Sequence, residues 1–251
     1  MGVSLQGRVA VVSGGAGGIG AAICRTLAAA GANLVVGYNS SREPALRLVE
    51  ELAETGGAHC ALPVPVTDSV ALAGLAAEVE RRYGRCDLLV NCAGTTRYVP
   101  HDDLDGLDDE LFERILATNV RGPFATLRAL RPLLQRSDAA LVVNISSIAA
   151  VSAMGSNVAY CASKAALDNM TRSLARALAP AIRVVSVSPG LADTEFVQRM
   201  DRAWRDEQAE RTPLRRLAEP REVADAVLAA ATHLTFTTGA VIPVDGGRPL
   251  S

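Results

Sequence analysis

The sequence predicts an α/β fold in which one doubly wound parallel sheet of about seven strands carries helices on both faces. Short runs that are apolar at nearly every residue alternate with segments of helical periodicity, a pattern typical of strands buried on both sides. The chain has 251 residues, 49% of them hydrophobic, which is enough for one large core. Because no linker or internal repeat divides the chain, we expect a single domain over 1–251.

The first pair of elements is the most clearly marked. Residues 8–12 form an apolar run that ends in a glycine-rich turn at 13–20. From Ile19 onward, apolar residues recur at helical spacing until Gly31. The sequence therefore predicts a strand, a glycine turn and a helix in direct succession.

The later elements continue the alternation. Further strands are predicted at 33–36, 62–66, 87–90, 140–145, 182–187 and 240–244. Helices are predicted at 43–55, 69–82, 111–135, 160–179 and 220–233.

A long charged insertion at 191–216 precedes the last helix. Phe196, Met200 and Trp204 lie four residues apart in it and form an apolar stripe. The stripe could pack a short helix against the rest of the domain. Long insertions in compact domains are often lids, so we also expect this segment to cover a substrate, and the two interpretations are compatible.

Composition and charge argue against several classes of protein. The formal net charge is -2, from 25 basic and 27 acidic residues, so no global field attracts nucleic acid or an anionic membrane. The five cysteines are scattered without a C-x-x-C pair, and the three histidines share no ligand spacing. The N-terminus lacks an apolar leader and no run is long enough to span a membrane. We therefore expect a cytoplasmic protein with a small-molecule substrate.

Residues 101–110 contain six acidic side chains, which could suggest a cation site. The stronger interpretation is the start of a helix, where Asp108 could act as the cap and the helix dipole favours negative charge. We therefore predict no metal site there.

The glycine turn predicts a bound dinucleotide. Gly15-x-Gly17-x-x-Gly20 fits the general pattern, and Gly14-x3-Gly18-x-Gly20 fits a wider one. In both registers glycines permit a tight turn and a close backbone approach, and the helix N-terminus faces the pyrophosphate. The strand before and the helix after supply the context that the motif requires.

The end of the second strand indicates which dinucleotide is preferred. An NAD site usually has Asp or Glu there, about 20 residues beyond the glycines, to hold the ribose hydroxyls. This chain has Tyr38-Asn39-Ser40-Ser41 and then Arg42, so no acid repels a 2'-phosphate and Arg42 could pair with it. We predict NADP in preference to NAD, while Arg42 could also be a plain surface charge.

Tyr160 and Lys164 form a candidate proton-transfer pair. They stand four residues apart on a predicted helix, a spacing that puts both side chains on one face. A free phenol, with a pKa of about 10, exchanges protons poorly near neutrality, and a neighbouring ammonium favours its phenolate form. The pair could also be an ordinary helix surface, so the rest of the chain decides its role.

With these residues assembled, the chain resembles the short-chain dehydrogenase/reductase family over essentially its whole length. The motifs that match, in the family's order, are the turn at 13–20, Asn91-Cys92-Ala93-Gly94, Asn119-Val120-Arg121-Gly122, Asn144-Ile145-Ser146-Ser147, Tyr160-x3-Lys164, Pro189-Gly190 with Thr194, and Val244-Asp245-Gly246-Gly247. The resemblance implies a Rossmann-type fold and an NAD(P)-dependent oxidoreductase that moves hydride between a nicotinamide and a carbonyl or secondary alcohol. Its overall character is most similar to 3-oxoacyl-acyl-carrier-protein reductases.

The resemblance also implies a catalytic tetrad of Asn119, Ser147, Tyr160 and Lys164. Tyr160 would be the proton donor or acceptor, and Ser147 would hydrogen-bond the carbonyl oxygen and stabilise its developing charge. Lys164 would favour the phenolate and bind the nicotinamide ribose, and Asn119 would position a water that links Lys164 to solvent.

The glycine turn, the second strand and the resemblance together indicate a set of cofactor-binding residues. These are Ser13, Gly14, Gly15, Gly17, Gly18, Ile19, Gly20, Tyr38, Asn39, Ser40, Arg42, Val66, Asn91, Ala93, Gly94, Tyr160, Lys164, Pro189, Gly190, Leu191 and Thr194.

Three positions depart from the family's usual pattern. Pro65 stands where a side chain commonly bonds the adenine, and Val66 or Asp68 could substitute for it. Cys92 replaces a second asparagine, and a small buried thiol can pack there. Gly17 stands where many NADP-dependent members carry a basic residue, which weakens the case for NADP.

Two classes of function remain open at this stage. The first is an NADP-dependent carbonyl reductase or alcohol dehydrogenase, including a 3-oxoacyl thioester reductase that would dock a carrier protein on arginines such as Arg128 and Arg131. The second is a catalytically silent NAD(P)-binding sensor or regulatory module, although such proteins commonly lose a tetrad residue. The resemblance further implies a homotetramer or homodimer, with substrate choice set by 95–99, 149–157 and 191–216.

Overall fold

The computed structural model describes residues 2–250, and for Phe196 it describes the backbone alone. Within these residues, seven parallel strands form one sheet in the order β3-β2-β1-β4-β5-β6-β7. They are β1 (Val9–Ser13), β2 (Asn33–Tyr38), β3 (Cys60–Pro63), β4 (Leu88–Asn91), β5 (Ala140–Ile145), β6 (Ile182–Pro189) and β7 (Val241–Val244). The strand order reverses between β1 and β4, so a crevice forms at their carboxyl ends. The predicted doubly wound α/β fold is confirmed.

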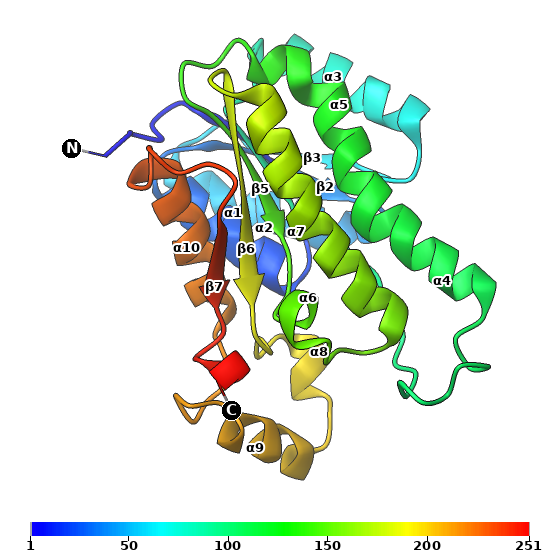
Figure 1. Cartoon of the computed structure of the whole chain (residues 1–251). Coiled ribbons are helices and arrows are strands. Elements are labelled where there is room, and N and C mark those ends of the chain that lie inside the picture. Colours follow the sequence, from blue (N-terminus) through cyan, green and yellow to red (C-terminus); the bar gives the residue numbers. More distant parts are fainter. Residues whose placement is uncertain (1, 251) are drawn as a thin grey trace.

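Helices cover both faces of the sheet (Figure 1). One layer contains α1 (Gly18–Ala29), α2 (Arg42–Leu52) and α10 (Pro220–Thr232), and the other contains α3 (Ser69–Tyr83), α4 (Asp109–Leu116), α5 (Gly122–Leu134) and α7 (Val158–Leu178). Three short helices, α6 (Ala149–Ser152), α8 (Glu195–Gln198) and α9 (Arg202–Glu210), lie beyond the carboxyl ends of the strands.

Alternate residues of each central strand fill two separate cores. In β1, Ala10 and Val12 pack on the side of α1 and α10, whereas Val9 and Val11 pack on the side of α3 and α5. All four are at most 2% exposed. Burial on both sides explains why the strands are apolar at successive positions, and it makes the sheet a rigid support for the loops at its carboxyl edge.

The long helix predicted over 111–135 is divided by a π-helical turn, Ala117–Arg121. Pro123 lacks the N–H that an uninterrupted α-helix would direct to the carbonyl of Asn119. Gly122 allows the helix to lie against Val66, because an added Cβ would come within 2.8 Å of the Val66 Cγ2 atom. The periodicity of the sequence did not reveal this interruption. Asn119 is the middle residue of the π-helical turn.

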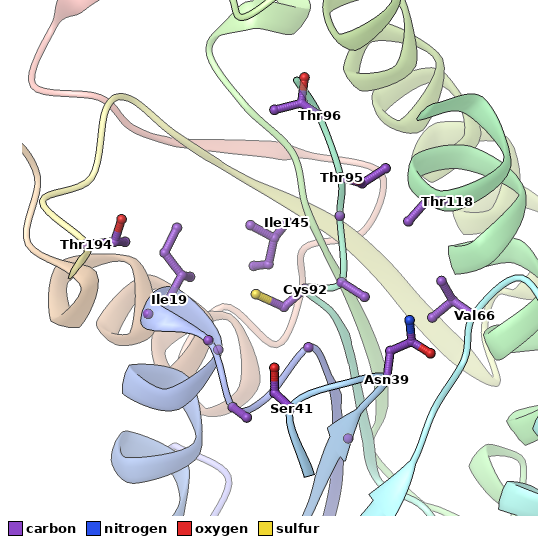
Figure 2. Close-up of a pocket in the computed structure, with 18 of the residues that line it drawn as sticks. Ile19, Asn39, Ser41, Val66, Cys92, Thr95, Thr96, Thr118, Ile145 and Thr194 are labelled. Carbon is purple, nitrogen blue, oxygen red and sulfur yellow. The ribbon is translucent and has the colours of Figure 1, made fainter. Parts of the chain in front are cut away.

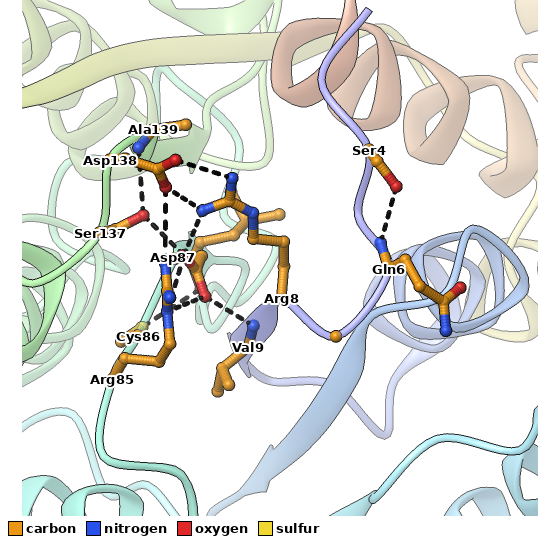
Figure 3. A network of polar contacts seen from close by, with 12 residues as sticks. Ser4, Gln6, Arg8, Val9, Arg85, Cys86, Asp87, Ser137, Asp138 and Ala139 are labelled. Atoms are coloured by element: carbon orange, nitrogen blue, oxygen red, sulfur yellow. Dashed lines mark hydrogen bonds and ion pairs between the residues drawn. The ribbon is translucent and has the colours of Figure 1, made fainter.

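A polar network connects several strands at their amino ends, on the edge of the sheet opposite to the crevice (Figure 3). Asp87, 4% exposed, accepts hydrogen bonds from the Val9 amide at 2.9 Å, from Ser137 Oγ at 2.6 Å, and from Arg8 and Arg85. Burial alone would raise the pKa of Asp87, but these donors outweigh it and hold the pKa below its ordinary value. The network joins the starts of β1, β4 and β5.

The acidic segment at 101–110 begins a helix, as expected. The carboxylate of Asp108 accepts a hydrogen bond from the Leu111 amide at 2.7 Å, and α4 starts at the next residue. Within residues 2–250, no group of three or more His, Cys, Asp or Glu side chains is placed to hold a metal ion. None of the helices described there is both long and apolar enough to cross a membrane.

The insertion at 191–216 carries α8 and α9 and is tied to the body by polar contacts. Arg248, near the C-terminus, donates to the carbonyl of Gln208 at 2.8 Å, and within the insertion Arg205 pairs with Asp193 at 3.2 Å. Met200 and Trp204 are each 37% exposed, so they pack only in part. The side chain of Phe196, the third member of the predicted stripe, lies outside the described part of the chain.

Candidate active site

A cleft of about 1060 Å³ opens at the carboxyl edge of the sheet. Its wall is formed by the glycine turn, the ends of β2, β4, β5 and β6, and residues of α4 and α7 (Figure 2). The predicted site residues that line it are Gly14, Gly17, Gly18, Ile19, Gly20, Tyr38, Asn39, Ser40, Val66, Ala93, Gly94, Ser147, Tyr160, Lys164, Pro189, Gly190 and Thr194.

Steric contacts explain the glycines of the turn. Gly14 has φ +65°, and an added Cβ would lie 2.9 Å from both the nitrogen and the Cα of Ala93. A Cβ on Gly20 would lie 2.1 Å from the carbonyl oxygen of Gly14, and one on Gly18 would lie 2.8 Å from the Thr194 methyl group. The turn is thus packed against itself, against the loop that follows β4 and against the segment that follows β6.

The N-terminus of α1 opens into the cleft with its amides available. Its first turn carries no acidic residue. The N-cap residue, Gly17, has no side chain that could bond these amides. Free amides and the positive end of the helix dipole favour an anion such as a pyrophosphate. The geometry fits the dinucleotide that the turn predicts.

Five predicted cofactor residues do not line the cleft, namely Ser13, Gly15, Asn91, Leu191 and Arg42. Ser13 Oγ accepts hydrogen bonds from the amides of Cys92 at 3.2 Å and Ala93 at 3.3 Å, which fixes the start of the next loop. Asn91 donates to Asn144 Oδ1 at 2.8 Å across β4 and β5. The Gly15 amide donates to the carbonyl of Gly37 at 2.8 Å, and Leu191 lines a smaller neighbouring cavity of about 220 Å³.

Arg42 lies outside the cleft. Its guanidinium pairs with Glu43 at 3.2 Å, and its side chain is 65% exposed on the first turn of α2. The residues that line the cleft just after β2 are Asn39, Ser40 and Ser41, of which Asn39 and Ser41 are labelled in Figure 2. Here the groups positioned to meet a ribose or a phosphate are an amide and two hydroxyls.

The charged residues of the cleft are mainly basic. Among its described lining residues, Arg114, Lys164 and Arg199 are cations, and Glu195 is the only carboxylate. The whole chain carries a formal net charge of -2. The lining thus carries more cations than carboxylates, although Arg114 pairs with Glu110 at 3.7 Å and Arg199 with Glu195 at 4.0 Å.

Tyr160 and Lys164 lie on α7 and both reach the cleft. Lys164 is 7% exposed; its Nζ donates to the carbonyl of Ile145 at 2.9 Å and lies 5.6 Å from the centroid of the Tyr160 ring. Ser147, just after β5, lines the same cleft, and its Oγ accepts a hydrogen bond from the Ala149 amide at 3.2 Å. A hydroxyl, a phenol and an ammonium thus share one pocket.

Asn119 lies directly behind these groups and is 1% exposed. Its Oδ1 accepts from the Thr95 amide at 2.8 Å, and its Nδ2 donates to the Thr95 carbonyl at 3.0 Å and to Ser163 Oγ at 3.1 Å. A Cβ on Gly94 would lie 3.4 Å from Asn119 Oδ1 and 3.9 Å from Lys164 Nζ. The structure therefore brings all four predicted tetrad residues to one place.

Comparison with known proteins decides the family. A family model described as "Enoyl-(Acyl carrier protein) reductase" matches residues 14–248. A ketoacyl reductase assigned to the granaticin polyketide synthase of Streptomyces violaceoruber is 39% identical over 96% of each chain. The 3-oxoacyl-[acyl-carrier-protein] reductase FabG of Thermotoga maritima is 32% identical over 97% of this chain and 98% of its own. The chain belongs to the short-chain dehydrogenase/reductase family.

A solved structure extends the likeness to a member with bound cofactor. The angucycline C-6 ketoreductase LanV, crystallised with bound NADP, has a TM-score of 0.90 and 29% identity, over 99% of this chain and 98% of its own. Short-chain dehydrogenases/reductases are NAD(P)-binding oxidoreductases that act on small molecules, so that coarser statement holds for this chain as well.

The structure adds cleft residues that the sequence did not indicate. Thr67, Arg114 and Thr118 line this short-chain dehydrogenase/reductase cleft, together with Ser41 and Thr95 from segments that the sequence had singled out. Arg114 and Thr118 are four residues apart and share a helical face, but neither stands three or four residues from Asn119. The others lie in loops whose course no periodicity predicts.

Val66, one of the two substitutes considered for Pro65, lines the cleft beside Val64 and Thr67. The carboxylate of Asp68, the other substitute considered, instead accepts hydrogen bonds from the amides of Val70 at 2.9 Å and Ala71 at 3.0 Å. It caps α3 and does not line the cleft.

Proposed function

We propose that the protein is an NADP-dependent carbonyl reductase or alcohol dehydrogenase. The observation that carries this proposal is the meeting of Ser147, Tyr160 and Lys164 in a cleft that also contains the glycine turn. When bound, the dinucleotide would supply or accept the hydride. The residues of the glycine turn, the end of β2 and the segment from Pro189 to Thr194 would hold it.

The protein's own groups would handle the proton and the developing charge. In reduction, the Tyr160 hydroxyl would give its proton to the substrate oxygen, and in oxidation the phenolate would take that proton back. Ser147 Oγ would donate a hydrogen bond to the same oxygen and stabilise negative charge on it. Both side chains face the cleft, where a substrate could reach them together.

Lys164 would serve both the phenol and the cofactor ribose. An ammonium has three donors, and one of them goes to the carbonyl of Ile145, which leaves donors for a ribose hydroxyl and for a water. Its Nζ also lies 5.6 Å from the centroid of the Tyr160 ring, beside the phenol.

Asn119 would act through an oxygen atom. Both hydrogens of its side-chain amide are used, by Thr95 and by Ser163. A water between Lys164 and solvent would therefore donate a hydrogen bond to an oxygen of Asn119 while accepting one from Lys164.

The preference for NADP is supported by the end of β2 and by the charge of the cleft. Asn39, Ser40 and Ser41 are uncharged donors where an NAD site usually has a carboxylate. Arg42 is paired with Glu43, so the support for NADP comes from these three residues and from the basic lining, in place of the arginine pairing predicted from sequence.

The substrate would be a ketone or a 3-oxoacyl thioester. The test measures NADPH and NADH oxidation with acetoacetyl thioesters and a panel of cyclic, aliphatic and sugar-derived ketones. Turnover of at least one carbonyl, faster with NADPH, is expected. If ketones are turned over but no thioester is, the proposal of an acyl substrate is refuted. Faster turnover with NADH than with NADPH would refute the proposed cofactor preference.

For the assembly, we propose one domain per chain and a homotetramer or homodimer. Large apolar side chains are exposed on α4 and α5, with Phe112 at 37% and Phe124 at 41%, and near the C-terminus, with Leu250 at 87%. Light scattering on the purified protein tests the proposal, and a monomer at micromolar concentration would contradict it.

A further inference from the structure

Asn157 is a fully buried side chain at the start of the catalytic helix. It is 0% exposed and is the N-cap of α7. Its Oδ1 accepts a hydrogen bond from the backbone amide of Tyr160 at 2.7 Å. The cap therefore holds the backbone of the proposed proton donor.

The other end of the same side chain holds the loop that follows β4. Asn157 Nδ2 donates to the carbonyl of Arg97 at 2.7 Å and to Thr96 Oγ1 at 3.2 Å. Both amide hydrogens are thus used on the loop at 95–101, and the oxygen is used on the helix. A residue that served only as a cap would need the oxygen alone.

Asn119 makes the complementary connection. It binds both backbone groups of Thr95 and donates to Ser163 Oγ, which in turn donates to the carbonyl of Tyr160 at 2.7 Å. The amide and the carbonyl of Tyr160 are therefore each linked to the 95–97 segment, one through Asn157 and the other through Ser163 and Asn119.

Further contacts fasten this loop to the segment just before α7. The Val99 amide donates to the Ser156 carbonyl at 2.8 Å, and the Ser156 hydroxyl lies 2.5 Å from Thr96 Oγ1. Thr95 and Thr96 form part of the cleft wall (Figure 2). The position of this wall relative to Tyr160 is thus set by the bonds of Asn157 together with those of Ser156 and Asn119.

We infer that Asn157 is a positioning residue: it fixes the cleft wall formed by Thr95 and Thr96 relative to Tyr160, and so sets how a carbonyl substrate is presented. The inference rests on the proposed carbonyl chemistry. It assigns Asn157 an effect on substrate turnover and none on cofactor affinity, because the side chain does not line the cleft and contacts neither the glycine turn nor β2.

Asn157→Ser tests the inference because serine keeps a capping oxygen and removes both donors. We expect kcat/KM for the carbonyl to fall on the order of 100-fold, as for a small misplacement of reacting groups, with NADPH affinity unchanged. Asp68→Ala is the matched control, since it removes the N-cap of α3 outside the cleft. It should lower stability without changing kcat/KM.

A second variant, Thr96→Val, changes an exposed residue of the loop in place of the buried Asn157. Thr96 is exposed and accepts one of the two Asn157 bonds, so its loss should lower kcat/KM in the same direction by about 10-fold. If Asn157 acts through this loop, the double variant will cost less than the sum of the single costs. Strict additivity would overturn the inference.

Hydrogen exchange separates this inference from the proposed function. In Asn157→Ser, the backbone amides of Thr95 and Val99, which are bonded to Asn119 and Ser156, should exchange faster than in the native protein and in Asp68→Ala. A native protein that turns over no carbonyl would refute the proposed function, while the exchange rates would still decide whether Asn157 holds the loop. Native exchange, or native kcat/KM in an active enzyme, would overturn the positioning role.

Discussion

Replacing Gly20 by alanine tests whether the glycine turn is held together by contact between its own backbone segments. The added Cβ would lie 2.1 Å from the carbonyl oxygen of Gly14 and 3.0 Å from the Gly15 Cα, whereas real Cβ atoms essentially never approach within 3.0 Å. The Gly14 peptide would have to move away by most of an ångström. That carbonyl accepts a hydrogen bond from the Gly17 amide at 3.3 Å, which the movement would weaken.

The cost can be estimated from these contacts. Overpacking of this kind costs about 1–3 kcal/mol, and a lost hydrogen bond costs about 1 kcal/mol. Alanine is favoured over glycine within a helix by about 1 kcal/mol, which offsets part of the loss. We expect a net destabilisation of about 1–3 kcal/mol and a loss of NADPH affinity of at least about tenfold, because the turn that approaches the pyrophosphate is displaced.

Gly74→Ala is the matched control. Gly74 lies inside α3, and a Cβ there would meet nothing within 4 Å. The same substitution should therefore stabilise the protein by about 1 kcal/mol and leave NADPH affinity unchanged. Urea denaturation gives the free energy of unfolding, and titration of NADPH fluorescence gives the affinity. Native stability and affinity in Gly20→Ala would refute the steric reasoning.

Two further predictions concern cofactor choice and acid stability. Ser40→Asp places a carboxylate beside the proposed 2'-phosphate, so NADPH affinity should fall by more than about tenfold relative to NADH; an unchanged NADPH-to-NADH ratio in steady-state assays would place the phosphate elsewhere. The pKa of Asp87 is lowered in the folded protein, so its stabilising effect is present above the unfolded-state pKa and is lost as the pH falls through the folded-state value. The native protein should therefore exceed Asp87→Asn in unfolding free energy most strongly near neutral pH, and the gap should shrink below about pH 4. Denaturant unfolding at several pH values measures this gap, and a gap independent of pH would contradict the assignment.

The features predicted from sequence share one property: each follows from a local pattern. The strand, glycine turn and helix at the start of the chain are specified by burial and by positions such as Gly20, where a side chain cannot fit. The spacing of Tyr160 and Lys164 fixes their shared helical face, and the structure places both in the cleft. The cap at Asp108 could likewise be predicted from a local pattern, the acidic residues that precede the helix.

The features that were missed depend on contacts between distant segments. The π-helical turn at Asn119 reflects Pro123 together with the packing of Gly122 on Val66, which no periodicity reports. Arg42 is an exception, because its pairing with the adjacent Glu43 is a local contact. Asn157 has no signal beyond that of a helix cap, because its role arises from a loop some 60 residues earlier in the chain.

The assignment of Tyr160 as the proton donor is tested most directly by Tyr160→Phe. This change removes one hydroxyl and leaves the backbone contacts of Tyr160 with Asn157 and Ser163 in place. NADPH binding is measured by fluorescence, and NADPH oxidation is measured with a carbonyl that the native protein reduces. The account predicts native affinity and a fall in kcat of about 100-fold to 10,000-fold. Native kcat in Tyr160→Phe would contradict it, and a native protein that binds NADPH but turns over no carbonyl or alcohol would favour a nucleotide-binding sensor instead.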